Sequence, residues 1–247
     1  MSDRFATKAI ALLDLTDLSE TADEAGLAAL CERASTPLGP VAAVCIWPRF
    51  VAAARQRLAD SPIGVATVVN FPAGSADAAA VLAETERAIV DGADEIDLVL
   101  PYQAVMAGDE HTAAALVGAV RASIPPGRLL KVILETGALG TPERIARAAR
   151  IAIGAGADFI KTSTGKTRIS ATPEAARIML EAIRAAPRPV GFKASGGIRT
   201  REDAHAYLAL AEAVMGKGWP RPDTFRFGAS GLLDALLAGA AAPDSAY

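Results

Sequence analysis

The chain has 247 residues, of which 51% are hydrophobic and 21% are charged, and its formal net charge is -3. This composition is typical of one globular domain and excludes an intrinsically disordered chain. It also argues against a nucleic-acid partner, because the positive charges are scattered through helical stretches that also carry Glu and Asp.

The beginning of the chain and the cysteines indicate where the protein works. Residues 1–18 contain an apolar run that Asp14 and Asp17 interrupt too early for a signal peptide or a membrane span. Cys31 and Cys45 are too few for a disulfide framework, and the chain has no His or Cys cluster with metal-site spacing. We therefore expect a soluble cytoplasmic protein with no membrane partner and no metal.

Eight short apolar runs, bounded by turn residues and separated by Ala-rich stretches with helical periodicity, predict strands. The first run is the weakest of the eight. The predicted strands cover residues 11–15, 41–47, 64–70, 95–100, 129–135, 158–162, 189–194 and 224–228.

The helices between these strands have recognisable ends. The stretch 75–92 reads as a helix that ends at a Gly, and Thr141 and Thr172 are each followed by Pro and Glu, which predicts a capped helix start. Eight β-then-α units predict a single α/β domain over residues 1–247, folded as a TIM (β/α)8 barrel, with a loosely held tail at 239–247. An open doubly wound sheet is the alternative, which the lack of a GxGxxG motif after the first strand disfavours.

Lysine is scarce in this chain, with 6 Lys against 19 Arg. Four of these lysines lie in or beside predicted strands: Lys131, Lys161, Lys166 and Lys193. Lysine can lose its proton and attack a carbonyl carbon, whereas arginine cannot. The placement therefore indicates a lysine nucleophile at the carboxyl ends of the strands.

Charged residues inside predicted strands mark the candidate catalytic groups, which are Asp97, Lys161 and Lys193. Two-residue alternation places each of them on the face that looks into the barrel. A structural ion pair is the alternative for any one pair taken alone. Two neighbouring ammonium groups favour loss of a proton from one of them, and we expect that one to be the nucleophile Lys161.

Glycine-rich turns follow the sixth, seventh and eighth predicted strands, and their backbone amides suit a phosphate group. Each turn alone is weak evidence, because such loops are often glycine-rich for backbone reasons. The predicted lining comprises Ser163, Thr164, Lys166, Ser195, Gly196, Gly197, Ser230 and Gly231.

Four further residues lie outside the predicted catalytic group and the glycine-rich turns. Asn70, at the end of a strand, is expected to contact substrate, whereas Cys45 is expected to be a small buried hydrophobe. His111 and His205 fall on predicted helices away from strand ends, so we expect them on the surface.

Eight segments, in order and spanning nearly the whole chain, form a distinctive set. The segments are DLTDL (14–18), AAVCIWPRFV (42–51), VATVVNFPAG (65–74), EIDLVLPY (95–102), LKVILETGAL (130–139), GADFIKTSTGK (156–166), GFKASGGIRT (191–200) and FRFGAS (225–230). Together they resemble the 2-deoxyribose-5-phosphate aldolase family. They add Thr16 and Gly228 to the predicted substrate site.

The resemblance implies a TIM barrel that cleaves 2-deoxy-D-ribose 5-phosphate reversibly to D-glyceraldehyde 3-phosphate and acetaldehyde, without a metal or cofactor. It implies that Lys161 forms the Schiff base, that Lys193 perturbs Lys161, and that Asp97 relays protons. The chain resembles the longer form of the family that ends in tyrosine, so Tyr247 is a candidate contributor from the tail.

Two alternatives to this function stay open at the level of sequence. One is another phosphate-binding barrel lyase or isomerase whose lysine acts as an acid, and the other is a barrel that binds a sugar phosphate without turning it over. The expected partners are small phosphorylated sugars and aldehydes. A homodimer is the expected assembly.

Overall fold

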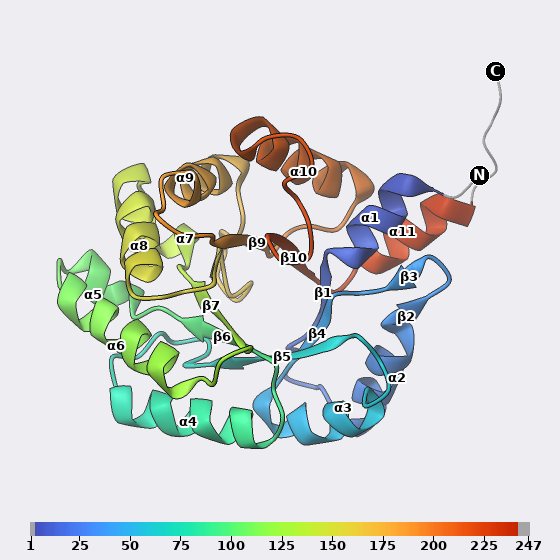
Figure 1. The fold of residues 1–247 in the computed structure, drawn as a ribbon, viewed down its shortest axis with the longest axis horizontal. Helices are drawn as coiled ribbons and strands as arrows, with labels where there is room; N and C mark the ends of the chain where they lie inside the picture. The colour runs from blue at the N-terminus through green and yellow to red at the C-terminus, as the bar shows by residue number, and fades with distance from the viewer. Residues whose placement is uncertain (1–2, 242–247) are drawn as a thin grey trace.

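The computed structural model describes residues 3–241, which form a closed barrel of parallel strands surrounded by helices (Figure 1). Neighbouring strands around the barrel follow the order β1-β10-β9-β8-β7-β6-β5-β4. The predicted TIM barrel is therefore confirmed. The barrel strands are β1 Leu13–Asp17, β4 Ala43–Ile46, β5 Gly64–Val69, β6 Glu95–Val99, β7 Leu129–Ile133, β8 Phe159–Lys161, β9 Gly191–Ser195 and β10 Phe225–Ala229.

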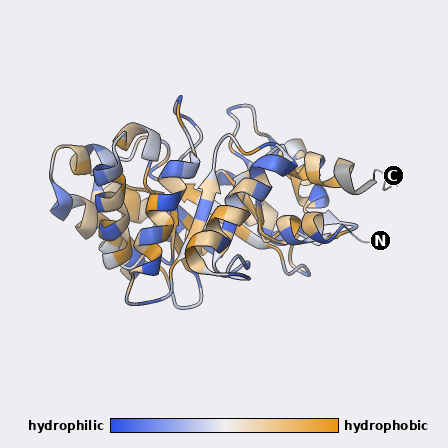
Figure 2. Cartoon of the chain, turned by 90° about the horizontal axis from the view of Figure 1, so that it is seen from above, coloured by the Kyte–Doolittle hydropathy of each residue, from blue (hydrophilic) through white to orange (hydrophobic). Residues whose placement is uncertain are grey.

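The helices lie outside this barrel and carry both hydrophobic and hydrophilic residues (Figure 2). This mixture is expected of helices that pack one face against the sheet and expose the other to solvent. They are α1 Arg4–Ala11, α2 Glu24–Arg33, the short 3-10 helix η1 Pro48–Phe50, α3 Val51–Arg57, α4 Ala78–Val90, α5 Tyr102–Met106, α6 Glu110–Ser123, α7 Thr136–Leu139, α8 Pro142–Gly154, α9 Pro173–Arg184, α10 Arg201–Met215 and α11 Leu232–Ala241.

The predicted helix starts are confirmed by their cap geometry. The side chain of Thr141 accepts a hydrogen bond from the backbone N–H of Arg144, and Thr172 accepts one from Ala175, with Pro at the first position of both helices. The helix predicted in 75–92 is α4, which begins after the capping side chain of Asp77.

The beginning of the chain differs from the prediction. The first strand was expected at 11–15, but Ala11 ends α1 and β1 runs over Leu13–Asp17. Asp3 caps α1, and the buried residues Ala6, Ala9 and Ile10 lie at helical spacing, so the apolar run that we read as the start of a strand is partly the buried face of a helix. A small antiparallel pair, β2 Ser35–Thr36 and β3 Gly39–Pro40, was not predicted.

The far end of the chain is described only in part. Helix α11 extends to Ala241, so residues 239–241 of the predicted tail belong to a helix. Residues 242–247, including Tyr247, lie outside the described residues.

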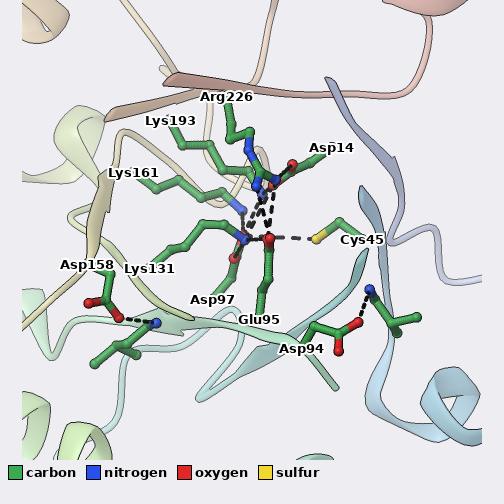
Figure 3. Close-up of polar contacts among 12 residues, drawn as sticks. Asp14, Cys45, Asp94, Glu95, Asp97, Lys131, Asp158, Lys161, Lys193 and Arg226 are labelled. Carbon is green, nitrogen blue, oxygen red and sulfur yellow. Dashed lines mark hydrogen bonds and ion pairs between the residues drawn. The ribbon is translucent and has the colours of Figure 1, made fainter. Parts of the chain in front are cut away.

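Aspartates that precede two strands tie the barrel together at the amino-terminal ends of those strands. Asp94 accepts a hydrogen bond from the backbone N–H of Val65 on β5, and Asp158 accepts one from Leu130 on β7, both at 2.8 Å. Arg55 pairs with Asp94, and Arg121 pairs with Asp158. Figure 3 shows both aspartates apart from the charged groups at the barrel centre, so they belong to the frame that holds the strands in register.

The interior of the barrel differs from one side to the other. The inward-facing residues of β4 and β5 are small or apolar and include Ala43, Cys45, Ala66 and Val68, all buried. On the opposite side, the ring of Phe159 occupies the space left by Gly191, where a Cβ atom would lie 2.3 Å from a ring carbon. Between these two apolar surfaces, the inward positions of six strands carry charged side chains.

Candidate active site

Seven charged side chains converge at the centre of the barrel from β1, β6, β7, β8, β9 and β10 (Figure 3). Strand alternation explains the convergence, because charged residues two positions apart, such as Glu95 and Asp97, point to the same face. We call this group the barrel ion cluster, and its members are Asp14, Glu95, Asp97, Lys131, Lys161, Lys193 and Arg226.

Asp97 lies at the middle of the cluster and accepts hydrogen bonds from three lysines. The Nζ atoms of Lys161 and Lys193 donate to its Oδ2 atom at 2.8 and 2.7 Å, and Nζ of Lys131 donates to Oδ1 at 2.9 Å. The structure therefore brings together the three predicted catalytic residues, Asp97, Lys161 and Lys193.

The other two carboxylates hold Arg226, the one remaining cation of the cluster, and also contact two of the lysines. Asp14 lies 2.5 Å from Nζ of Lys193 and 2.6 Å from Nη1 of Arg226. Glu95 pairs with Nη2 of Arg226 at 3.0 Å and also with Lys131. These contacts form a second layer around Asp97.

The ionisation of Lys161 differs from that of its neighbours. Burial lowers the pKa of Lys161, and the ammonium of Lys193 lowers it further, while Asp97 acts in the opposite direction without reversing the shift. Burial acts on Lys193 in the same way, but Asp14 and Asp97 outweigh it and raise the pKa of Lys193. The pKa shifts thus favour the neutral amine at Lys161 and the ammonium at Lys193, which is the arrangement that a lysine nucleophile needs.

The charged forms of Asp97 and Lys131 are favoured by their partners in the cluster. Burial alone would raise the pKa of Asp97, but Lys131, Lys161 and Lys193 keep it well below its usual value. Burial would lower the pKa of Lys131, yet the three surrounding carboxylates raise it well above its usual value. Lys161 is therefore the member of the cluster best suited to react as an uncharged base.

A cavity of about 520 Å³ opens at the carboxyl ends of β1, β8, β9 and β10. Eight of the predicted substrate residues lie in its wall: Thr16, Thr164, Lys166, Gly196, Gly197, Gly228, Ser230 and Gly231. Ser195 lines it as well, whereas Ser163 is buried near Thr136 and is not part of the wall. We call this cavity the glycine-rich pocket.

Gly228 is where the pocket meets the ion cluster. A Cβ atom at this position would lie 2.9 Å from Cε of Lys193 and 2.8 Å from Oγ of Ser195. A larger residue would push against both side chains. At this point the side chain of Lys193, a member of the cluster, lies directly behind the wall of the pocket.

Two loops of the pocket are fixed by hydrogen bonds that the sequence analysis missed. Glu135, a buried residue with a φ of 56°, accepts hydrogen bonds from the Oγ1 atoms of Thr164 and Thr167 at 2.5 and 3.2 Å. Nζ of Lys166 donates to the carbonyl oxygen of Leu18 at 2.7 Å, which links the loop after β8 to the loop after β1. Glu135 could have been identified from the sequence, because it is an acidic residue at the end of the strand predicted at 129–135.

Asn70 does not lie in the pocket wall, and its side chain is used inside its own loop. Its amide donates to the carbonyl oxygens of Ser75 and Val99 and accepts from the backbone N–H of Ser75. The residue has a φ of 57°, which asparagine tolerates better than most residues. The structure therefore offers a structural role for Asn70 and does not bring it to the other predicted substrate residues.

The two histidines and Cys45 also lie outside the pocket wall. His111 and His205 are exposed on α6 and α10, as expected. Cys45 is fully buried, as expected, but its Sγ atom also lies 3.9 Å from Oδ2 of Asp97, and burial raises the pKa of its thiol. It is therefore a neutral neighbour of the ion cluster.

Four members of the cluster were not predicted as site residues: Asp14, Glu95, Lys131 and Arg226. Each lies inside a strand, so the criterion that identified Asp97 applied equally to them. A TIM barrel fixes the ring order of its strands, but the sequence does not give their register, which decides which inward charges lie at the same height.

Within residues 3–241, no group of three or more His, Cys, Asp and Glu side chains is arranged to hold a metal ion.

No helix in the described part of the chain is long and apolar enough to cross a membrane.

A closed (β/α)8 barrel with a buried lysine of lowered pKa next to a glycine-rich pocket defines an enzyme of the barrel class whose chemistry centres on an amine. Comparison with known proteins is more specific. The chain belongs to the DeoC/LacD family of aldolases, whose sequence profile matches residues 8–238.

Three individual proteins that resemble this chain are described as deoxyribose-phosphate aldolases. The chain is 58% identical over 233 residues to a deoxyribose-phosphate aldolase of Agrobacterium fabrum, covering 94% of this chain and 90% of that protein. Its structure resembles an apo-form putative deoxyribose-phosphate aldolase from Toxoplasma gondii, with a TM-score of 0.89, 28% identity and 98% of both chains covered. It also resembles one from Coccidioides immitis, with a TM-score of 0.85, 29% identity, and 97% and 88% of the two chains covered.

Proposed function

We propose that the protein is a class I aldolase that reversibly cleaves 2-deoxy-D-ribose 5-phosphate to D-glyceraldehyde 3-phosphate and acetaldehyde. The observation that carries the proposal is the buried Lys161 amine, hydrogen-bonded to Asp97 and lowered in pKa beside Lys193. The 58% identical deoxyribose-phosphate aldolase of Agrobacterium fabrum supports the choice of substrate.

In the cleavage direction, the neutral Nζ of Lys161 attacks the aldehyde carbon C1 of the open-chain sugar. The resulting carbinolamine loses water to give a protonated imine, which draws electrons from the C2–C3 bond. A base takes the proton of the C3 hydroxyl, the C2–C3 bond breaks, and glyceraldehyde 3-phosphate leaves. The enamine that stays on Lys161 takes up a proton at C2, and hydrolysis of the imine releases acetaldehyde and the free lysine.

Asp97 is the proposed proton carrier for these steps, acting directly or through a water molecule. It already contacts Lys161 and Lys193, so a proton passed between the amine and the carboxylate travels less than 3 Å between heavy atoms. Lys193 stays positively charged and favours the neutral form of Lys161.

The glycine-rich pocket is the proposed site for the phosphate group of the substrate. Backbone N–H groups of glycine-rich loops bind an anion, and in this fold the loops after the seventh and eighth strands often do so. Lys166 and the hydroxyl groups of Thr164 and Ser230 lie in the same wall and add a charge and two donors.

Trapping tests the central step. Acetaldehyde and borohydride should leave a stable adduct on Lys161, detected by intact mass and peptide mapping, and the Lys161→Leu variant should not be labelled. An absent adduct would favour a barrel enzyme in which the lysine acts only as an acid, and an adduct that persists in Lys161→Leu would place the imine on another residue. Release of glyceraldehyde 3-phosphate from deoxyribose 5-phosphate then separates an enzyme from a barrel that only binds the sugar phosphate.

Three further proposals rest on sequence alone. The protein acts in the cytoplasm, it forms a homodimer, and Tyr247 contributes to turnover from the tail. Light scattering tests the dimer, and removal of residues 242–247 should lower turnover without unfolding the barrel if the tail takes part.

A further inference from the structure

The charges of the barrel ion cluster do not balance. Among the described residues, its cations are Lys131, Lys161, Lys193 and Arg226, and its carboxylates are Asp14, Glu95 and Asp97. With every group ionised, four positive charges against three negative ones leave a surplus of one. The cluster is buried, where an uncompensated charge is costly, so the surplus favours release of one proton.

Arg226 is the cation that cannot release it, because a guanidinium stays protonated in proteins. Its Nη1 atom lies 2.6 Å from Oδ1 of Asp14 and its Nη2 atom 3.0 Å from Oε1 of Glu95, and its Nε atom donates to the carbonyl oxygen of Pro222. The Cζ atom of the guanidinium lies over the ring of Phe159, 5.8 Å from the ring centroid. The arginine thus engages two of the three carboxylates with a permanent charge.

The proton must then come from a lysine, and the contacts single out one of the three. Lys131 contacts Asp14, Glu95 and Asp97, and Lys193 contacts Asp14 and Asp97. Among the described residues, Lys161 contacts Asp97 alone, which it shares with both other lysines. The thiol of Cys45, whose pKa is raised by burial, lies 3.9 Å from the same Oδ2 atom of Asp97 and adds no carboxylate to the site.

We propose that Arg226 is a positioning residue that makes Lys161 the neutral amine of the resting enzyme, by occupying Asp14 and Glu95 with a charge that cannot be lost. The inference rests on the proposed Schiff-base role of Lys161 and explains how that lysine is prepared. Arg226 is not part of the wall of the glycine-rich pocket, and its ion-pair partners are Asp14 and Glu95, so it acts on Lys161 through the carboxylates that the lysines share.

Replacement of Arg226 by Met tests the charge count. The variant has three lysines for three carboxylates, so Lys161 keeps its proton to a higher pH. The measurement is the rate of Lys161 labelling by acetaldehyde and cyanoborohydride as a function of pH, because acetaldehyde itself does not titrate. We expect the profile to move to alkaline pH and the rate at neutral pH to fall about tenfold, as for the loss of one nearby charge.

Replacement of Glu95 by Gln has the opposite sign. It leaves four cations for two carboxylates, so the labelling profile should move to acidic pH. The double variant Glu95→Gln/Arg226→Met restores the surplus of one, with three lysines against Asp14 and Asp97, and should return the profile to that of the unmodified protein. A purely structural role for Arg226 predicts no such restoration.

Controls separate this inference from the proposed function. Arg87→Met removes an arginine from an exposed ion pair on α4 and should leave the profile unchanged. Absence of any adduct in the unmodified protein would overturn the Schiff-base function itself. Normal labelling of the unmodified protein, with an unchanged profile in Arg226→Met or no acidic shift in Glu95→Gln, would overturn only the role of Arg226. If Arg226→Met does not fold, as judged by circular dichroism, the Glu95→Gln variant, which keeps Arg226, decides the question by the same profile.

Discussion

The barrel ion cluster and the glycine-rich pocket meet at Gly228 but are built in different ways. The cluster consists of charged side chains that belong to strands, and its members are buried. The pocket consists mainly of loop residues after the strands, many of them glycines that present backbone rather than side chain. Under the proposed function, bond making depends on side-chain charge in the buried interior, whereas substrate binding depends on the backbone of the loops at the pocket.

This contrast predicts that substitutions in the cluster change kcat and pH dependence, whereas substitutions in the pocket change KM and packing. Four predictions test it, beginning with the largest effect.

Replacement of Lys161 by Leu should lower kcat by about 10⁴-fold or more, since removal of a nucleophile abolishes the covalent route. Lys161→Arg should be equally inactive, although it keeps the positive charge, because a guanidinium does not form the imine. Turnover of deoxyribose 5-phosphate measures both. Lys217→Leu, which changes an exposed lysine, is the control and should keep full activity.

Replacement of Asp97 by Asn should lower kcat by about 10²- to 10³-fold, the range expected when a proton carrier is lost. The three lysines that it holds lose a shared negative charge, so the pKa of Lys161 should fall further and labelling by acetaldehyde should decline less than turnover does. Comparison of the two rates checks this. Equal losses in labelling and turnover would indicate that Asp97 only shapes the site.

Replacement of Lys193 by Leu should move the activity profile to alkaline pH and lower the rate at neutral pH about tenfold. The sign follows from the pKa of Lys161, which Lys193 lowers: without this charge the pKa rises, and the neutral amine is a smaller fraction at pH 7. A kcat profile against pH measures the shift. An unchanged profile would remove Lys193 from the preparation of the nucleophile.

Two glycines of the pocket provide a matched pair with smaller effects. Gly228→Ala places a Cβ atom against Lys193 and Ser195 and should lower the free energy of unfolding by about 1–3 kcal/mol. Gly231→Ala places its Cβ atom where no described atom lies within 4 Å, so its stability should change by no more than about 0.5 kcal/mol. Urea unfolding measures both. A similar loss in the two variants would mean that backbone flexibility, not the contact with the cluster, sets the need for glycine.

The sequence was sufficient to predict the architecture, and it predicted three residues that the structure brings together at the barrel centre; their catalytic roles stay a prediction. The eight strands were found because a buried parallel strand is an apolar run between turn residues, and the first was misplaced because a helix contributes to the same run. Asp97, Lys161 and Lys193 were selected because each is a charge inside a predicted strand, but the same criterion also fits the other four members of the cluster.

The rest depends on geometry that spacing along the chain does not contain. Asp14 and Arg226 lie 212 positions apart and meet only because β1 pairs with β10. Asn70 shows a second limit of sequence-based prediction. A polar residue at a strand end was expected to contact substrate, but its left-handed backbone conformation and its hydrogen bonds within the loop give it a structural role.

The pairing of β1 with β10 has a further consequence. In a ring of strands no strand is first, and α1 and α11 lie side by side where the ring closes (Figure 1). The order of the eight units is therefore cyclic in space, and the break in the covalent chain occupies one of several equivalent positions. A circular permutant that joins the two ends and opens the chain between α6 and β7, away from the pocket, should rebuild the same centre from a different starting residue.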